Sequence, residues 1–238
     1  MTATSFSAAD SLARSCHGGN RHAAAAIAGC TPNDILDFSA SLNPFGPPDS
    51  VLEAIANAPQ AIANYPDPQS VELRRALARH YALDPEWIMI GNGAAELLTW
   101  IARDSAQLGT THLFTPAFGD YARALKATSA PFVTTAMTDE AGALDPDRAL
   151  GWLREPLPDV LWINNPHNPT GHLWTRSQLL DVLPRFQLVV ADEAFMDFLP
   201  GAGESLLADV SDWPQLVVVR SLTKFYAIAG LRVGFVVA

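Results

Sequence analysis

The chain has 238 residues, 49% of them hydrophobic, which predicts a globular protein with a sizeable core. Its formal net charge is −10 and it has no run of lysine or arginine, which argues against nucleic acid or an anionic membrane as a partner. The two cysteines, Cys16 and Cys30, form neither a disulfide framework nor a zinc pattern. No segment approaches about 18 consecutive apolar residues, and the first residues lack an export signal. We therefore expect a cytoplasmic protein.

The first elements in chain order form an arm that leads into the main domain. Residues 1–45 are rich in Ala, Gly, Ser and Asn, with a short helix predicted at 21–28. Residues 46–238 are predicted to form one large α/β domain, in which Ser70 caps the first long helix.

Short apolar runs then alternate with helical segments. Asp145-Pro146 and a capping box that begins at Thr175 predict the starts of two of these helices. The alternation predicts a three-layer α/β/α domain with a mostly parallel sheet, in which ligands bind at the carboxyl ends of the strands. The predicted strands are 87–90, 112–115, 132–136, 160–164, 188–192, 216–220 and 233–237. Because the apolar run 233–238 has no covering helix after it, we expect the chain to be the front part of a longer protein.

Residues 91–98, Gly-Asn-Gly-Ala-Ala-Glu-Leu-Leu, follow a predicted strand and open a helix. Small residues at this position allow backbone N–H groups to approach a phosphate, aided by the helix dipole. The run matches only half of the dinucleotide fingerprint, because Glu96 replaces the third glycine, and this disfavours NAD. A purely structural turn is the alternative interpretation.

Two further turns, each after a predicted strand, carry side chains that could contact the planar ring of a cofactor. Residues 115–121 place Phe118 where an aromatic side chain could stack on a cofactor, although a core aromatic is the alternative. Residues 164–171 form a rigid turn that holds Asn168, whose amide can hydrogen-bond a phenolate oxygen. We expect the neighbouring His167 to be solvated, and the six histidines show no metal-ligand spacing.

The chain has only two lysines, and they stand in different settings. Lys126 lies on a predicted exposed helix face, whereas Lys224 lies at the mouth of an apolar strand. A desolvated amine with a lowered pKa can act as a nucleophile, and only lysine can form a Schiff base. Ser221, Thr223 and Arg232 flank Lys224 and could hold a phosphate near it.

Asp192 ends the apolar run 188–191. A carboxylate at that depth needs a cationic partner to stay charged. A protonated pyridine nitrogen would supply one; capping a helix or pairing with Arg232 are the alternatives. Asp192, Asn168 and Lys224 in this order are the groups that a pyridoxal phosphate (PLP) site requires.

Several motifs resemble those of one enzyme superfamily. They are His-Gly-Gly-Asn at 17–20, Asp-Phe-Ser-Ala-Ser-Leu-Asn-Pro at 37–44, Tyr-Pro-Asp at 65–67, Asp-Glu-Ala-Phe-Met-Asp-Phe at 192–198, and 220–232. On these motifs the whole chain resembles the PLP-dependent aminotransferase superfamily of fold type I, the aspartate aminotransferase fold. Within it, the pattern is most similar to the threonine-phosphate decarboxylases of cobalamin biosynthesis. The histidinol-phosphate aminotransferases are also similar, but they usually carry tyrosine at the position of Phe195 and lack the first motif.

The resemblance implies a role for each candidate residue. Lys224 would form the Schiff base with the cofactor, Asp192 would pair with the ring nitrogen, Asn168 would contact the ring oxygen, and Phe118 would stack on the ring. The residues implied to anchor the phosphate are Gly93, Ala94, Ala95, Ser221, Thr223 and Arg232, with Tyr65 from the second subunit of a homodimer. The residues implied to lie near the substrate are His17, Gly18, Ser41 and Asn168.

The activity that the resemblance implies is PLP-dependent decarboxylation of O-phospho-L-threonine to (R)-1-aminopropan-2-yl phosphate. An aminotransferase acting on a phosphorylated amino compound such as histidinol phosphate is the alternative, and a non-catalytic PLP-binding fragment is a third. Ser41 stands where the family pattern has asparagine, which replaces an amide by a shorter hydroxyl. The small C-terminal domain of the family, with its substrate-gripping arginines, is expected to be missing from the 238 residues.

Overall fold

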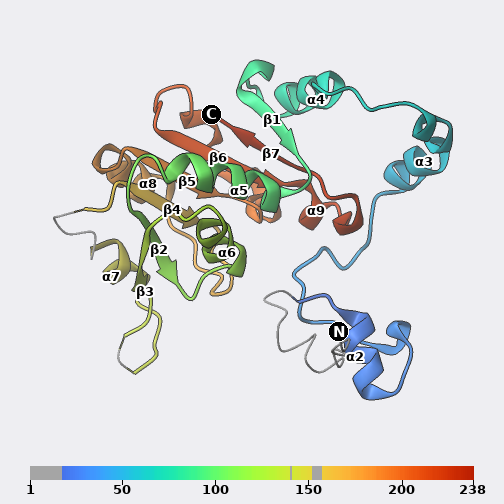
Figure 1. Cartoon of the computed structure of the whole chain (residues 1–238), viewed down its shortest axis with the longest axis horizontal. Coiled ribbons are helices and arrows are strands. Elements are labelled where there is room, and N and C mark those ends of the chain that lie inside the picture. Colours follow the sequence, from blue (N-terminus) through green and yellow to red (C-terminus); the bar gives the residue numbers. More distant parts are fainter. Residues whose placement is uncertain (1–17, 140, 152–156) are drawn as a thin grey trace, which may run out of the picture. The chain divides into compact units, whose positions relative to one another are not determined.

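Figure 1 shows the computed structural model of the chain, which describes residues 18–139, 141–151 and 157–238. The chain divides into two compact units, Met1–Leu42 and Asn43–Ala238. The described part of the first unit holds helix α2 (Arg21–Ala28) and a short 3₁₀ helix, η1 (Pro32–Asp34). Asn20 Oδ1 accepts a 3.0 Å hydrogen bond from the Ala23 N–H at the start of α2. The predicted helix at 21–28 is therefore confirmed.

The second unit contains the remaining helices and strands. Its α-helices are α3 (Asp49–Asn57), α4 (Val71–Tyr81), α5 (Ala94–Ser105), α6 (Gly119–Ala127), α7 (Pro146–Gly151), α8 (Arg176–Val182) and α9 (Leu222–Phe225). Its strands are β1 (Ile88–Gly91), β2 (Thr111–Thr115), β3 (Phe132–Ala136), β4 (Val160–Asn164), β5 (Leu188–Asp192), β6 (Leu216–Ser221) and β7 (Gly234–Val237). Its 3₁₀ helices are η2 (Pro59–Ala63), η3 (Pro85–Trp87), η4 (Leu183–Arg185), η5 (Met196–Phe198), η6 (Pro200–Ala202), η7 (Leu207–Asp209) and η8 (Ala229–Leu231).

The strands form one sheet in the order β1-β7-β6-β5-β4-β2-β3. Every neighbouring pair is parallel except the two pairs of β7, which runs antiparallel to β1 and to β6. Each strand that the apolar runs predict is present, so the predicted, mostly parallel sheet is confirmed. Among the described residues, no helix combines the length and the apolar character that crossing a membrane requires.

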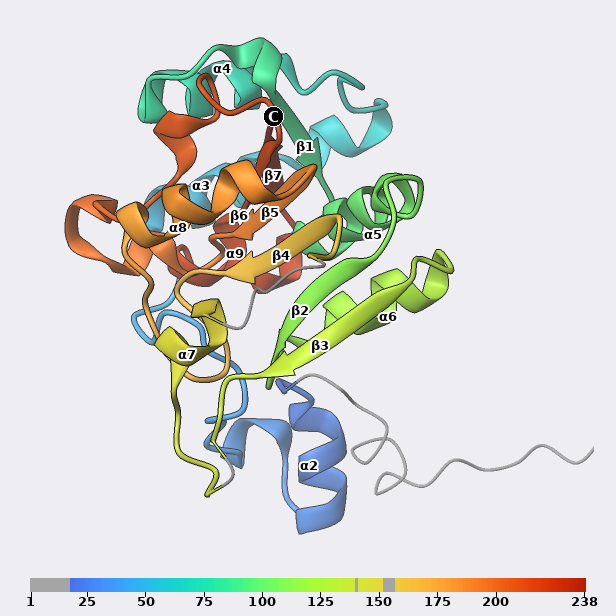
Figure 2. The same ribbon diagram turned by 90° about the vertical axis from the view of Figure 1, so that its left-hand side faces the viewer.

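Helices cover both faces of the sheet, which is therefore the middle of three layers (Figure 2). Helices α5 and α6 pack on one face, and α4, α7 and α8 pack on the other. Strand β4 contributes side chains to the hydrophobic cores on both faces of the sheet. Leu161 and Ile163 pack in one core, and Val160 and Trp162 pack in the other. Burying each such side chain contributes roughly 1.5–3 kcal/mol, so a central strand that is apolar at its first four positions stabilises both interfaces.

The capping predictions have mixed outcomes. Thr175 forms the predicted capping box with Gln178 at the start of α8. The prediction for Ser70 is wrong, because its backbone is left-handed with φ 47° and its side chain makes no cap hydrogen bond. Asp67 takes that role, since its Oδ2 accepts a 2.8 Å hydrogen bond from the Val71 N–H. A carboxylate is also the better partner for the positive end of the helix dipole.

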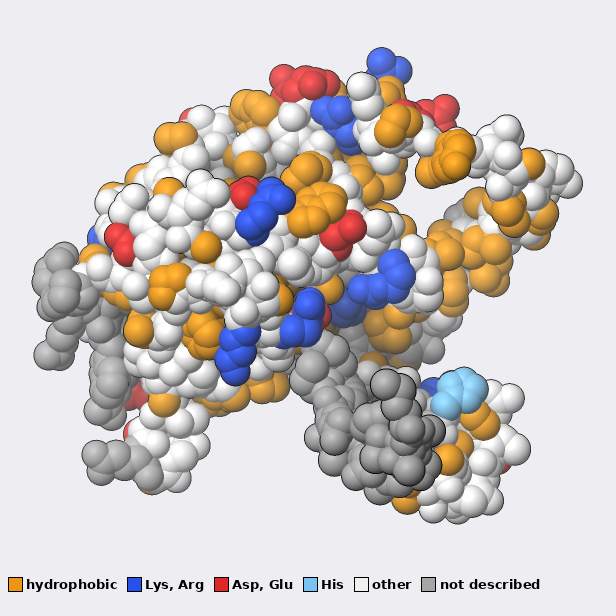
Figure 3. Space-filling view, in the orientation of Figure 1, with side chains coloured by type: hydrophobic (Ala, Val, Ile, Leu, Met, Phe, Trp, Pro, Cys, Tyr) orange, Lys and Arg blue, Asp and Glu red, His pale blue; other side chains and the backbone are white. Residues whose placement is uncertain are grey.

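Segment 43–66 leaves several apolar side chains exposed. Helix α3 and the following η2 contain no buried residue. Phe45, Ile62 and Tyr65 are each more than 80% exposed, and hydrophobic side chains are visible over this segment in Figure 3. An exposed apolar surface of this kind is a feature of protein interaction sites.

Candidate functional site

The candidate site lies at the carboxyl ends of the central parallel strands. Asn164 ends β4, Asp192 ends β5 and Ser221 ends β6. The register pairs Asn164 with Asp192 directly. Short loops after these strands then bring Asn168 and Lys224 to the same edge of the sheet, as the topology of such sheets predicts.

Asp192 is a buried carboxylate with hydrogen bonds to both oxygens. Its Oδ2 accepts a 2.6 Å hydrogen bond from the Tyr121 hydroxyl, and its Oδ1 accepts a 3.0 Å hydrogen bond from the Ala194 N–H. Burial raises the pKa of Asp192, while these two hydrogen bonds and the charge of Lys224 oppose the rise. Neither helix capping nor a pair with Arg232 is what holds it. A protonated ring nitrogen is a partner that such a carboxylate suits.

The Lys224 amine acts electrostatically on this carboxylate. Burial lowers the pKa of the Lys224 amine; the charge of Asp192 opposes that shift, and the charge of Arg232 adds to it. Nζ donates a 3.0 Å hydrogen bond to Thr223 Oγ1, which lies 2.8 Å from Ser221 Oγ. An amine with a lowered pKa reaches its neutral, nucleophilic form more readily. Lys126, by contrast, is exposed as expected.

Asn43 fixes the backbone beneath Lys224. Its backbone N–H donates a 3.1 Å hydrogen bond to the Lys224 carbonyl, and its Nδ2 donates a 2.8 Å hydrogen bond to the Phe225 carbonyl. These bonds add to the partners of the carbonyls at the end of α9, where the Lys224 carbonyl also accepts a 3.3 Å hydrogen bond from the Ala227 N–H. Asn43 lies within the 37–44 motif, but this role was not predicted from the sequence.

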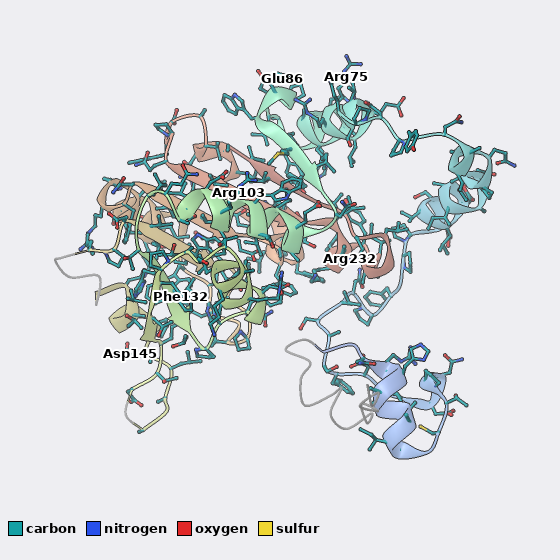
Figure 4. All side chains as sticks on the ribbon, viewed as in Figure 1. Arg75, Glu86, Arg103, Phe132, Asp145 and Arg232 are labelled. Carbon is teal, nitrogen blue, oxygen red and sulfur yellow. The ribbon has the colours of Figure 1, made fainter. Side chains whose placement is uncertain are left out.

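The start of α5 and Arg232 form a cradle for an anion. Gly93 has φ 86°, and a Cβ atom there would lie 2.6 Å from Arg232 Nη2. A Cβ atom on Gly234 would lie 2.7 Å from the Ala94 nitrogen, so β7 also begins against this helix end. Figure 4 shows Arg232 near the end of α5 that follows β1. The first-turn amides of Ala94 and Ala95 have no partner within the helix, and together with the exposed guanidinium they suit a phosphate.

The loop that carries Asn168 is tied to β5. The Asn168 N–H donates a 2.6 Å hydrogen bond to Asn164 Oδ1, and Asn164 Nδ2 donates a 2.8 Å hydrogen bond to the Asp192 carbonyl. Asn168 is therefore held close to the end of the strand that carries Asp192.

The expectation that His167 is solvated is wrong. The ring is buried, its Nδ1 lies 2.8 Å from Thr170 Oγ1, and it packs edge-on against Trp174. Burial lowers the pKa of His167 to about 4, because the charged ring would lose its hydration.

Phe118 and Tyr121 begin helix α6 together. Phe118 is half-buried, and its ring meets the Tyr121 ring edge-on at 5.5 Å between centroids. Stacking of Phe118 on a planar cofactor ring stays a prediction. The contact of Tyr121 with Asp192 was not predicted, although the spacing Phe118-x-x-Tyr121 at a helix start was a signal that the two rings share one face.

A buried ionic network stands behind the site. Arg220 Nε lies 3.1 Å from Glu193 Oε2, and Arg220 Nη1 lies 2.8 Å from Asp197 Oδ1. Arg220 Nη2 also donates a 2.9 Å hydrogen bond to Ser205 Oγ. Because Glu193 follows Asp192 and Arg220 precedes Ser221, the network joins the ends of β5 and β6. This network was not predicted from the sequence.

The roles of four further predicted residues stay predictions. Tyr65 is fully exposed, and its contact with the cofactor phosphate of a second subunit stays a prediction. Gly18 and Ser41 belong to the first unit, so their contact with substrate also stays a prediction. His17 lies outside the described residues.

Two motifs of the first unit do pack together. A Cβ atom on Gly18 would lie only 1.7 Å from the Ser39 carbonyl oxygen, and the Gly19 N–H donates a 2.8 Å hydrogen bond to Ser39 Oγ. Glycine at position 18 is therefore required by its contact with the 37–44 motif.

Comparison with known proteins gives consistent relatives. The family described as aminotransferase class I and II matches residues 33–238. Threonine-phosphate decarboxylase from Salmonella typhimurium is 37% identical over 95% of this chain and 62% of its own length. The solved L-threonine-O-3-phosphate decarboxylase from Porphyromonas gingivalis is 27% identical with a TM-score of 0.73, covering 86% of this chain and 60% of that one.

A second solved structure carries the cofactor. Histidinol-phosphate aminotransferase from Sinorhizobium meliloti, in complex with pyridoxal-5′-phosphate, is 27% identical with a TM-score of 0.73. The match covers 84% of this chain and 55% of that one. The chain thus spans less than two thirds of the length of each of these relatives.

Proposed function

This chain belongs to the aminotransferase class I and II family, whose cofactor is pyridoxal 5′-phosphate, and on that premise we propose a specific reaction. The reaction is decarboxylation of O-phospho-L-threonine to (R)-1-aminopropan-2-yl phosphate, a step of cobalamin biosynthesis in the cytoplasm. The observation that carries the chemistry is a partly buried lysine amine, held by a 3.0 Å hydrogen bond to Thr223 Oγ1, whose charge acts on the buried Asp192 carboxylate at the same edge of the sheet. Similarity to the Salmonella threonine-phosphate decarboxylase over 95% of the chain supports the choice of substrate.

The residues at the sheet edge fit the cofactor. Lys224 would hold it covalently through Nζ, and Arg232 with the α5 amides would hold its phosphate. Asp192 would hold a proton on the ring nitrogen, and Asn168 would orient the ring oxygen. When bound, the cofactor supplies an acceptor for the electron pair that the departing carboxylate leaves on the substrate's α carbon.

Lys224 also has a part in completing the reaction. Loss of carbon dioxide must be balanced by delivery of one proton to the α carbon. Lys224 Nζ would carry that proton to the α carbon when it is not holding the cofactor, and burial holds the pKa of the Lys224 amine below the ordinary value for lysine. Gly18, Ser41 and His17 would hold the phosphorylated substrate, as the family resemblance implies.

The alternative is transamination of a phosphorylated amine, which the similarity to the Sinorhizobium enzyme favours. Phe195 counts against it, because histidinol-phosphate aminotransferases usually carry tyrosine there. The third possibility is that this chain binds the cofactor without catalysis, since it spans 62% of the length of the Salmonella enzyme.

The test begins with the wild-type chain, added pyridoxal phosphate, borohydride reduction and peptide mapping. We expect the reduced label on Lys224, its loss in Lys224→Arg and its retention in Lys126→Arg. Carbon dioxide release from O-phospho-L-threonine would support the decarboxylase. Dependence on 2-oxoglutarate without release would favour the aminotransferase, and label without turnover of either kind would favour the binding fragment. Absence of label from Lys224 would overturn the proposal.

We extend the proposal to a homodimer in which Tyr65 of one copy reaches the phosphate site of the other. The full exposure of Tyr65 and the absence of buried residues from α3 and η2 support it. Sedimentation of the chain, alone and as Tyr65→Ala, with cofactor affinity measured in both, would check the oligomer and the contribution of Tyr65.

A further inference from the structure

One hydrogen bond at the candidate site joins two almost fully buried groups. The Tyr121 hydroxyl and Asp192 Oδ2 are 2.6 Å apart, and the two residues are 3% and 4% exposed. They come from different layers, since Tyr121 lies on α6 and Asp192 ends β5. A short bond to a carboxylate in such a setting is stronger than a neutral hydrogen bond.

The Tyr121 ring is held on two sides. The Phe118 ring meets it edge-on at 5.5 Å between centroids, and the Trp162 ring does so at 5.7 Å. Because Trp162 belongs to β4 and Phe118 to the start of α6, the hydroxyl has a fixed position relative to the sheet. Tyr121 therefore acts as a rigid donor.

The groups that face this pair define its charge state. Asp192 is faced by the Tyr121 hydroxyl from α6, the Ala194 N–H from its own loop and the Lys224 ammonium from α9. Asp120 is the further charge that acts on Tyr121. Burial favours neutral Asp192, and hydrogen bonds to the charged form oppose this. Burial also raises the pKa of Tyr121 well above its ordinary value, so the phenol keeps its proton and remains a donor.

We propose that Tyr121 is a positioning residue of the cofactor site, which keeps Asp192 charged and turned toward the ring nitrogen. The inference rests on the proposed function, because it concerns the same site. Tyr121 touches the carboxylate and acts on the cofactor only through it. The start of α6 would then supply two functions, since Phe118, just before the helix, would stack on the ring and Tyr121, in its first turn, would orient the acid.

The test compares two tyrosine-to-phenylalanine variants. Tyr121→Phe removes the hydroxyl and keeps the ring. Tyr81→Phe is the matched control, because the Tyr81 hydroxyl donates a 3.2 Å hydrogen bond to a different carboxylate, Asp197. The dissociation constant of pyridoxal phosphate is measured from pH 5 to 9 by absorbance, and urea unfolding of each variant reports stability separately.

We expect Tyr121→Phe to weaken cofactor binding at pH 7 by roughly tenfold, the effect of about one charge-assisted hydrogen bond. The acidic limb of its binding curve should move up by about one pH unit, because neutral Asp192 becomes more favoured. Tyr81→Phe should bind as the wild type does. In an Asp192→Ala background, Tyr121→Phe should change the dissociation constant less than twofold.

Each contrary result has one meaning. Wild-type binding with label on Lys224, together with unchanged affinity and pH profile in Tyr121→Phe, would overturn this inference and leave the proposed function standing. The same loss of affinity in the presence and absence of Asp192, or a loss of stability without a shifted limb, would show that Tyr121 only supports the fold. A wild-type chain without label on Lys224 would overturn both.

Discussion

Removing the arginine from the buried Arg220 network should destabilise the protein severely. In Arg220→Met, Glu193 and Asp197 would lose the cation that lies 3.1 Å and 2.8 Å from their oxygens. Glu193 is fully buried, so water cannot replace the lost partner. Breaking a buried pair from one side costs about 3–5 kcal/mol. At roughly 2–4 °C per kcal/mol for a chain of this size, the melting temperature should fall by about 6–20 °C.

The loss should depend on pH in a defined direction. Burial raises the pKa of Glu193, and the charge of Arg220 opposes the rise, so the variant should raise the pKa further. A folded-state pKa above the unfolded value means that the folded protein binds the proton more tightly. Stability is then retained below the unfolded pKa, ordinarily near 4.5, and lost as the pH rises through the folded pKa. The deficit of Arg220→Met should be larger at pH 8 than at pH 5.

Urea unfolding, followed by tryptophan fluorescence at both pH values, measures the deficit. The double variant Glu193→Gln/Arg220→Met is the control, because without the acid at 193 most of the pH dependence should vanish. A loss in the free energy of unfolding of Arg220→Met below about 1 kcal/mol, or a loss equal at both pH values, would contradict this explanation. It would show that Arg220 does not keep the buried Glu193 carboxylate charged.

Two further substitutions test the site and the core. Gly93→Ala should weaken pyridoxal phosphate binding by about tenfold or more, because the new Cβ would lie 2.6 Å from Arg232 Nη2. Gly201→Ala is the control: Gly201 has a similar φ of 73° but open space around it, so this variant should leave binding unchanged. His112→Phe should flatten the loss of stability on acidification: burial lowers the pKa of His112 to about 4, so the folded state resists the proton and loses stability as the pH falls from about 6.5 toward 4. A weakened Gly201→Ala, or an acid limb as steep in His112→Phe as in the wild type, would count against these explanations.

The fold was predictable from sequence because its signals are local. Apolar runs separated by helices predicted the strands, and Thr175 with Gln178 predicted the start of α8. Ser70 failed because two nearby side chains could cap the same helix, and only the turn geometry selects Asp67. Which strand runs antiparallel to its neighbours also depends on the whole sheet, so no local sequence pattern predicts it.

The site was only partly predictable because many of its contacts join distant residues. The sequence motifs predicted Lys224, Asp192 and Arg232 as site residues, and the fold brings these three to one edge of the sheet. Tyr121 meets Asp192 from 71 positions away, a separation that no short pattern reports. The burial of His167 was not predicted because Trp174 covers its ring only after the loop between them has folded back.

The position of β7 has a consequence for the order of folding. Strand β1 lies at the sheet edge and pairs only with β7, so Ile88 finds its partner in Val237. During synthesis, the strands from β2 to β6 can assemble before β7 has been made. Strand β1 stays unpaired, with its backbone hydrogen-bonding groups exposed, until synthesis has passed Val237. Such a late, long-range closure slows folding and exposes an edge that invites pairing with other chains. A nascent chain of this kind would depend on chaperones during that interval, and truncations short of β7 should aggregate.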